Sequence, residues 1–139
     1  MPKKDPKLKK LSEMVKEELG DEDFELDFGL FYSIFRARLD GITDAREQWK
    51  IKHILSEIIA IVFFAVLCNE NEWVAIEDFA NDMEKELRKY LSLPGGIPSH
   101  DTIERVFSLI DERELERILV DVLLDIIVRA TKDEKLHLY

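Results

Sequence analysis

The longest apolar run of the chain, from Ile58 to Cys68, lies between Glu57 on one side and Asn69 and Glu70 on the other. A helix that spans a bilayer needs about 20 consecutive apolar residues, and this run is much shorter. A helix that is apolar on all sides must instead be covered by other elements of a folded core. We therefore expect a soluble protein with no membrane partner, built around one buried central helix.

Elsewhere in the chain, apolar residues recur at spacings of three and four, and no run alternates apolar and polar residues as a strand does. This pattern predicts an all-α fold, a compact bundle of about six or seven helices. The faces at Trp73–Ala80 and Met83–Leu91 are also compatible with one bent helix. The expected faces are Leu8, Leu11, Val15 and Leu19 before a stop at Gly20; Phe28, Phe31, Ile34 and Phe35 between a cap at Asp27 and a stop at Gly41; Ile51, Ile54, Leu55, Ile58, Ile59 and Val62; Trp73, Ile76 and Phe79 or Ala80; Met83, Leu87, Tyr90 and Leu91; Ile103, Val106, Phe107 and Ile110; and Leu115, Ile118, Leu119, Val122, Leu123 and Ile126.

The length of 139 residues fits one ordinary domain. We divide it into a charged N-terminal helix and acidic linker over 1–27, a helical domain over 28–129 and a polar tail over 130–139. Cys68 is the single cysteine, which excludes an internal disulfide and fits a reducing cytoplasm. We expect this thiol to be buried as a small hydrophobic group. The N-terminal lysines are followed by no apolar segment of the kind that signal peptides contain, so the predicted location is the cytoplasm.

The segment from Leu93 to Pro98, with the sequence LPGGIP, cannot continue a helix because proline lacks an amide donor and glycine favours turns. Ser99 after it is a typical N-cap for the next helix. Asp111, followed three residues later by Glu114, predicts a capping box at the start of the last helix, which we place over residues 112–129.

Ser99, His100 and Asp101 contain the residue types of a hydrolytic triad, but consecutive helical residues point about 100° apart and cannot align for proton relay. His53, His100 and His137 lack the spacing of a helical zinc site. No strand precedes the glycines as a phosphate-binding loop requires. We therefore expect no enzyme activity, no metal, no cofactor and no small-molecule substrate.

The formal net charge of -10 argues against wholesale binding to nucleic acid or to anionic lipid, because an acidic surface repels phosphate. The adjacent carboxylates Glu77–Asp78 and Asp111–Glu112 are expected to lie on solvated faces or to interact with helix dipoles. A cluster of N-terminal lysines is either a basic arm for the DNA backbone or a solubilising terminus. These lysines are Lys3, Lys4, Lys7, Lys9 and Lys10.

The helix that begins after Ser99 has the composition of a recognition helix, since a helix N-terminus attracts phosphate and the side chains of its first turns reach base edges. Together with the preceding helix it would form a helix-turn-helix-like pair near residues 83–110. Against this interpretation, Asp101 and Glu104 would lie beside phosphates, and the turn is longer than usual. The alternative is a role in helix capping and packing alone. The candidate DNA-binding residues are Ser99, His100, Thr102, Arg105 and Ser108.

Four sequence blocks occur in order within residues 30–128. They are Ile42–Arg46, His53–Ile58, Trp73–Phe79, and Gly96–Thr102 followed by Arg105–Phe107. In this order they resemble the DDE transposase-associated domain, which precedes the catalytic core in H-repeat-associated (ISAs-type) insertion-sequence transposases. The last block is the most specific. The resemblance implies transposon ancestry.

The chain departs from that family's pattern in three ways. Thr43 stands where the family often has proline, and Cys68–Glu72 replaces the small residues that tend to precede the tryptophan. In the family an RNase H-like domain with metal-binding carboxylates follows, whereas this sequence ends at Tyr139. We therefore expect a non-catalytic module that binds DNA or a transposase.

A second hypothesis is a helical protein-interaction or oligomerisation module with no DNA contact. The segment around residues 24–35 contains more aromatic residues than one short helix needs for its own core face. A homo-oligomer could bury the surplus. The residues concerned are Phe24, Phe28, Phe31, Tyr32 and Phe35.

Overall fold

The computed structural model describes residues 6–19, 28–38 and 55–132, and within these residues the chain forms seven α-helices and no strand. The all-α prediction is confirmed. The helices are α1 (Pro6–Leu19), α2 (Phe28–Arg36), α3 (Leu55–Leu67), α4 (Trp73–Asp82), α5 (Glu84–Leu87), α6 (His100–Ser108) and α7 (Glu112–Lys132).

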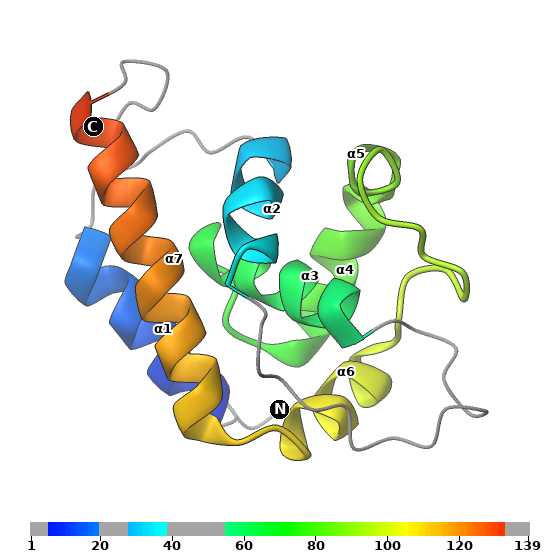
Figure 1. Cartoon of the computed structure of the whole chain (residues 1–139). Helices are drawn as coiled ribbons and strands as arrows, with labels where there is room; N and C mark the ends of the chain where they lie inside the picture. Colours follow the sequence, from blue (N-terminus) through cyan, green and yellow to red (C-terminus); the bar gives the residue numbers. More distant parts are fainter. Residues whose placement is uncertain (1–5, 20–27, 39–54, 133–139) are drawn as a thin grey trace.

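Helix α3 lies at the centre of the bundle, as its sequence predicts, and every residue from Glu57 to Leu67 is buried. Helices α1, α2 and α4 pack against it, and α7 runs along the side of the molecule in contact with α1 and α2 (Figure 1). Leu8, Leu11 and Val15 of α1 belong to the same core as the central helix. Helix α6 packs against α4 near the beginning of α7, and α5 lies at a far corner (Figure 1).

The phenylalanines of α2 are buried within the chain itself, and Tyr32 is half-buried against them. Phe28 meets Phe64 of α3 edge-on at 4.9 Å between ring centroids, and Phe35 meets Phe63 in the same way at 5.7 Å. Phe31 is fully buried between α2 and α3. The surplus that suggested an oligomer is therefore used in the core. Phe24 lies outside the described residues.

Two element boundaries differ from the predictions or refine them. A single residue, Met83, separates α4 from α5, which approaches the alternative of one bent helix. Helix α7 continues to Lys132, three residues beyond the predicted end at 129. Several predicted features fall outside the described residues: Gly20, Asp27, Gly41, the connection at 42–50, Ile51, Ile54 and residues 133–139.

The prediction that Cys68 is buried is wrong, because its side chain is exposed. Helix α3 ends at Leu67, and Asn69 adopts a left-handed conformation with φ 74°. Helices commonly end with one such residue just past the last turn. Among the described residues, no helix is both long and apolar enough to cross a membrane.

Candidate interaction surface on α6

Helix α6 has one buried face and one solvent face. Ile103, Val106 and Phe107 are buried, and the ring of Phe107 meets that of Trp73 in α4 edge-on at 5.5 Å. The exposed side carries Asp101, Glu104, Arg105 and Ser108. The spacing of three and four therefore predicted the buried face correctly, and the charged residues point outward.

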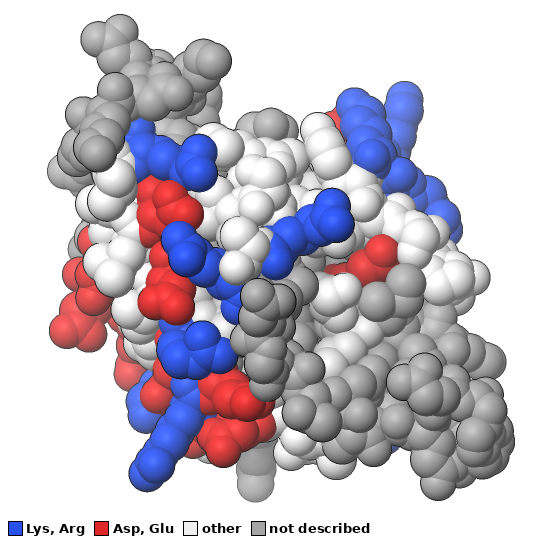
Figure 2. Space-filling model, viewed as in Figure 1, with Lys and Arg blue, Asp and Glu red and all other residues white. Residues whose placement is uncertain are grey.

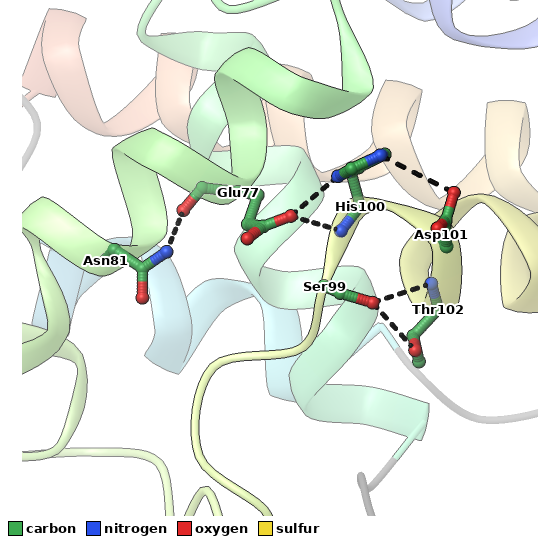
Figure 3. A network of polar contacts seen from close by, with 6 residues as sticks. All are labelled: Glu77, Asn81, Ser99, His100, Asp101 and Thr102. Carbon is green, nitrogen blue, oxygen red and sulfur yellow. Dashed lines mark hydrogen bonds and ion pairs between the residues drawn. The ribbon is translucent and has the colours of Figure 1, made fainter.

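Ser99 caps the N-terminus of α6, as predicted. Its backbone is extended, and its Oγ accepts a hydrogen bond from the Thr102 N–H at 3.2 Å. The same hydroxyl donates to Thr102 Oγ1 at 3.1 Å (Figure 3). Both hydroxyl side chains are thus engaged within the first turn. Asp111 likewise caps α7, by accepting the Arg113 N–H at 2.7 Å.

Glu77 of α4 provides a second support for the first turn of α6. Its Oε1 accepts the backbone N–H of His100 at 2.6 Å and lies 2.7 Å from His100 Nδ1. The other ring nitrogen, Nε2, lies 3.5 Å from Asp101 Oδ1, so the imidazole stands between two carboxylates (Figure 3). Asn81 donates to the backbone carbonyl of Glu77 at 3.1 Å.

These contacts shift the pKa values of both His100 and Glu77. The hydrogen bond to Glu77 raises the pKa of His100 above its ordinary value, and the charges of Asp101, Glu77 and Glu104 add to it. The backbone hydrogen bond from His100, followed by that from its ring, lowers the pKa of Glu77. Each group thereby favours the charged form of its partner.

Lys7 of α1 caps the other end of α6. Its Nζ donates to the carbonyl oxygens of Phe107 at 2.7 Å and Ile110 at 2.9 Å. Carbonyls at a helix C-terminus lack intrahelical partners and attract cations. Lys7 thus has a structural role that neither interpretation of the lysine cluster foresaw.

The other described lysines of α1 also face carboxylates. Lys10 lies 2.7 Å from Glu116 and 3.7 Å from Glu112, and Lys9 lies 4.0 Å from Glu13. Lys3 and Lys4 lie outside the described residues. The part of the basic arm that the structure describes is therefore committed to contacts with its own chain.

Glu57 of α3 fixes the turn that leads into α6. Its Oε2 accepts from the Ser92 N–H at 2.8 Å and from Ser92 Oγ at 3.0 Å, and its Oε1 accepts the Leu93 N–H at 2.9 Å. Leu93 has φ 44°, an unusual value for a side chain of this size, and the buried carboxylate holds it there. Sequence reasoning did not identify Glu57, and it expected Glu77 on a solvated face or beside a helix dipole without identifying His100 as its partner, because the partners are 35 and 23 residues away along the chain.

The structure brings the candidate residues together on one helix but engages most of them internally. Ser99 and Thr102 bond to each other, His100 bonds to Glu77, and Ser108 Oγ donates to the Arg105 carbonyl at 2.6 Å. The Arg105 side chain is exposed. His100 Nδ1 faces Glu77 and the Ser99 hydroxyl faces Thr102, which is not the geometry of a catalytic relay.

The neighbour of α6 in the bundle is α4, and α5 lies at the far corner of the view in Figure 1. Helix α5 has only four residues, Glu84–Leu87. Basic side chains gather at its corner of the molecule (Figure 2), where Arg88 pairs with Glu84 at 2.7 Å and Lys89 with Glu86 at 3.1 Å. The helix-turn-helix-like pair predicted near residues 83–110 would consist of α5 and α6. These two helices are far apart in the bundle.

A surface hollow of about 420 Å³ lies beside α7 and is lined by Arg38, Asp121, Leu124, Asp125 and Val128. Although partial burial opposes its ionisation, hydrogen bonds from Arg129 at 2.9 Å and Arg38 at 3.0 Å hold the pKa of Asp125 below its ordinary value. Acidic and basic side chains alternate along this side of the molecule (Figure 2). Both aspartates of the hollow are paired with arginines, which offset their charge.

No His, Cys, Asp or Glu cluster suited to a metal ion occurs within residues 6–19, 28–38 and 55–132. His53 and His137 fall outside these ranges.

A family model for the DDE_Tnp_1-associated domain matches residues 36–122. The chain belongs to this family. The match extends from the last residue of α2 to the middle of α7 and includes both Glu57 and Glu77, together with all of α6. The resemblance inferred from the four sequence blocks is thereby confirmed.

Several curated relatives are named as transposases. The "putative transposase YncI" of Escherichia coli O157:H7 is 42% identical over 80 residues, covering 58% of this chain and 20% of that protein. The "H repeat-associated putative transposase YbfD" of E. coli K12 is 37% identical over 84 residues, covering 60% of this chain and 33% of the relative. The chain thus spans about a fifth to a third of the length of these two proteins.

A shorter relative, the "inactive transposase YbfQ" of E. coli K12, is 42% identical over 65 residues, which cover 47% of this chain and 77% of that protein. No solved structure matches the chain.

The family match and the relatives together show that the chain is a transposase-related helical module.

Proposed function

We propose that this chain acts as a non-catalytic module of a transposition system, and that it contacts a transposase through the solvent face of α6. Membership of the DDE_Tnp_1-associated family and the transposase relatives support the setting. The relative named as an inactive transposase supports a role other than strand transfer.

The charge distribution is the observation that favours a transposase over DNA as the partner. The net charge is -10, and two of the carboxylates, Asp101 and Glu104, lie exposed on the solvent face of α6. Proteins that handle DNA carry basic surfaces, and an acidic module is electrostatically complementary to such a surface. The charge of Lys10 is offset locally by its ion pair with Glu116.

A second candidate function is DNA binding by the same helix. The exposed Arg105 guanidinium favours it, because arginine is the commonest reader of guanine in the major groove. The raised pKa of His100 extends the pH range in which a second positive charge lies in the first turn. The residues that would carry this function are Ser99, His100, Thr102, Arg105 and Ser108.

One binding experiment separates the two functions. The chain is titrated with a purified H repeat-associated transposase, and separately with duplex DNA that carries an element's terminal repeats, at several salt concentrations. We expect salt-dependent binding to the transposase, weakened about tenfold by Glu104→Lys at low salt. The matched control Glu17→Lys makes the same charge change at an exposed position of α1 and should have a much smaller effect.

Absence of transposase binding, or equal weakening by both charge reversals, would contradict the proposal. Salt-dependent binding to the duplex that Arg105→Ala abolishes would replace it with the second candidate. Circular dichroism of each variant confirms that the helical fold is retained.

A further inference from the structure

The first turn of α6 is joined to α4 by a side-chain pair whose two members both titrate. Glu77 Oε1 receives the backbone N–H and the Nδ1 of His100, and both distances are at or below 2.7 Å. The surface proposed to contact a partner thus rests on an imidazole, the side chain whose ordinary pKa lies closest to neutrality.

Both ring nitrogens of His100 face carboxylate oxygens, at 2.7 Å for Glu77 and 3.5 Å for Asp101. A carboxylate only accepts hydrogen bonds when ionised, so both contacts are favourable only when both nitrogens carry a proton. In the neutral ring one nitrogen loses its proton, and that nitrogen then faces a carboxylate with lone pair against lone pair. The geometry therefore fits the imidazolium.

The charged groups that face this ring are acidic. Helix α4 contributes Glu77, and α6 contributes Asp101 and Glu104. Lys7, the cation that α1 places on α6, contacts carbonyls at the opposite end of the helix. The electrostatic environment of His100 thus favours its protonated form.

We propose that Glu77, His100 and Asp101 form a pH-dependent latch, which holds the first turn of α6 on α4 while the imidazole is protonated and loosens it when the imidazole is neutral. The backbone N–H of His100 still donates to Glu77 in the neutral state, so the turn loosens without detaching. The latch does not depend on which macromolecule α6 contacts.

The sign of the pH dependence follows from the two shifts. The pKa of His100 is raised from 6.5, so its contribution is complete below pH 6.5 and is lost as the pH rises through the raised value. The pKa of Glu77 is lowered from 4.5, so its contribution is complete above pH 4.5 and is lost as the pH falls through the lowered value. The latch is tightest between these two ordinary values.

Native-state hydrogen exchange of α6 tests the latch. The reporter is the Ile103 amide, which donates to the Ser99 carbonyl at 2.9 Å and closes the first turn of the helix. Protection factors, corrected for the intrinsic exchange rate, are measured at about pH 5.5 and about pH 8.5, on either side of the ordinary histidine pKa. An amide of α3 in the same spectra reports global stability.

We expect Ile103 protection relative to α3 to fall by about threefold to tenfold at the higher pH, because the ionic contact between His100 and Glu77 is lost as the ring loses its proton. His100→Gln should remove this pH dependence, and Glu77→Gln should return the His100 pKa, followed by NMR of the ring protons, towards 6.5. The control His137→Gln removes an imidazole elsewhere in the sequence.

Ile103 protection that is equal at both pH values in the wild type would overturn the latch, and so would a pH dependence that persists in His100→Gln. A His100 pKa unchanged by Glu77→Gln would show that α4 does not hold the ring. These outcomes are independent of the transposase and DNA titrations, so either proposal can fail alone.

Discussion

Glu57 and Glu77 both fix the segment that leads into α6, but they lie in different surroundings. Glu57 holds the beginning of the segment at Ser92 and Leu93 from a buried position in the central helix. Glu77 holds its end at His100 from a partly exposed position on α4. The same functional group therefore positions the two ends of one connection.

The donors explain why the two carboxylates should differ in function. Glu57 receives two backbone N–H groups and a hydroxyl, none of which changes its charge near neutral pH. Glu77 receives a backbone N–H and an imidazole, and the imidazole does change its charge near neutral pH. A buried carboxylate with fixed donors stabilises one conformation, whereas a partly exposed one with a titratable donor can adjust the position of a helix to pH.

Removing the buried carboxylate is expected to have the largest effect. Glu57→Ala leaves the Ser92 and Leu93 amides without their acceptor and opens a void beside α3. We expect a loss of about 3–5 kcal/mol in the free energy of unfolding, because the unsatisfied buried Leu93 donor costs about 1–3 kcal/mol, and the void and the lost part-buried bonds to Ser92 add to this. Urea denaturation followed by circular dichroism measures it.

Glu57→Gln is the matched control, since it keeps an acceptor oxygen and should lose clearly less stability than the alanine variant. Equal losses in the two variants would mean that the negative charge, and not the hydrogen-bond geometry, is what this position requires. A loss below about 1 kcal/mol in Glu57→Ala would remove the contrast with Glu77.

An intermediate effect is expected from the cation at the far end of α6. Lys7→Met keeps much of the aliphatic side chain and removes the donor to the Phe107 and Ile110 carbonyls. We expect a loss of about 1.5–3 kcal/mol, the range for hydrogen bonds that involve a charged group. Thermal unfolding of this variant can be compared with Lys9→Met, which alters an exposed pair at 4.0 Å and should lose at most about 0.5 kcal/mol. Indistinguishable melting temperatures would refute the capping role.

The smallest effect on global stability is expected at the partly exposed carboxylate. Glu77→Gln retains an acceptor for the His100 amide and loses the ionic contact with the ring. We expect a loss of at most about 1 kcal/mol near pH 6, since exposed ion pairs contribute little. This difference should shrink as the pH rises above the raised pKa of His100, because the wild type loses the same contact there. A loss that equals that of Glu57→Ala would show that exposure does not separate the two positions.

Local patterns predicted much of the fold. Apolar spacing gave the buried faces of α6 and α7, and the residue types at Ser99 and Asp111 gave their caps. These features depend on residues within one or two turns of each other, which is why sequence reasoning reaches them. The exposure of Cys68 was missed because it depends on where α3 ends and how the chain turns at Asn69.

The supports of the candidate surface could not be predicted in this way. Lys7 meets a carbonyl 100 residues away, and Glu77 and Glu57 meet partners 23 and 35 residues away. Charged side chains of this kind are usually solvated, so composition offers no signal for the few that are not. Only the packing of α1, α3 and α4 around the segment before α7 selects them.

The sequence by itself determined the helical class, most of the buried faces, the two N-caps and the family, because each is written in short-range periodicity or in an ordered set of motifs. Tyr90, predicted on an apolar face, is exposed. The tertiary structure decided which charges face solvent and which hold α6 in place. It did so because a hydrogen bond needs its two groups within about 3 Å, and only the folded bundle brings Lys7, Glu57 and Glu77 to their partners.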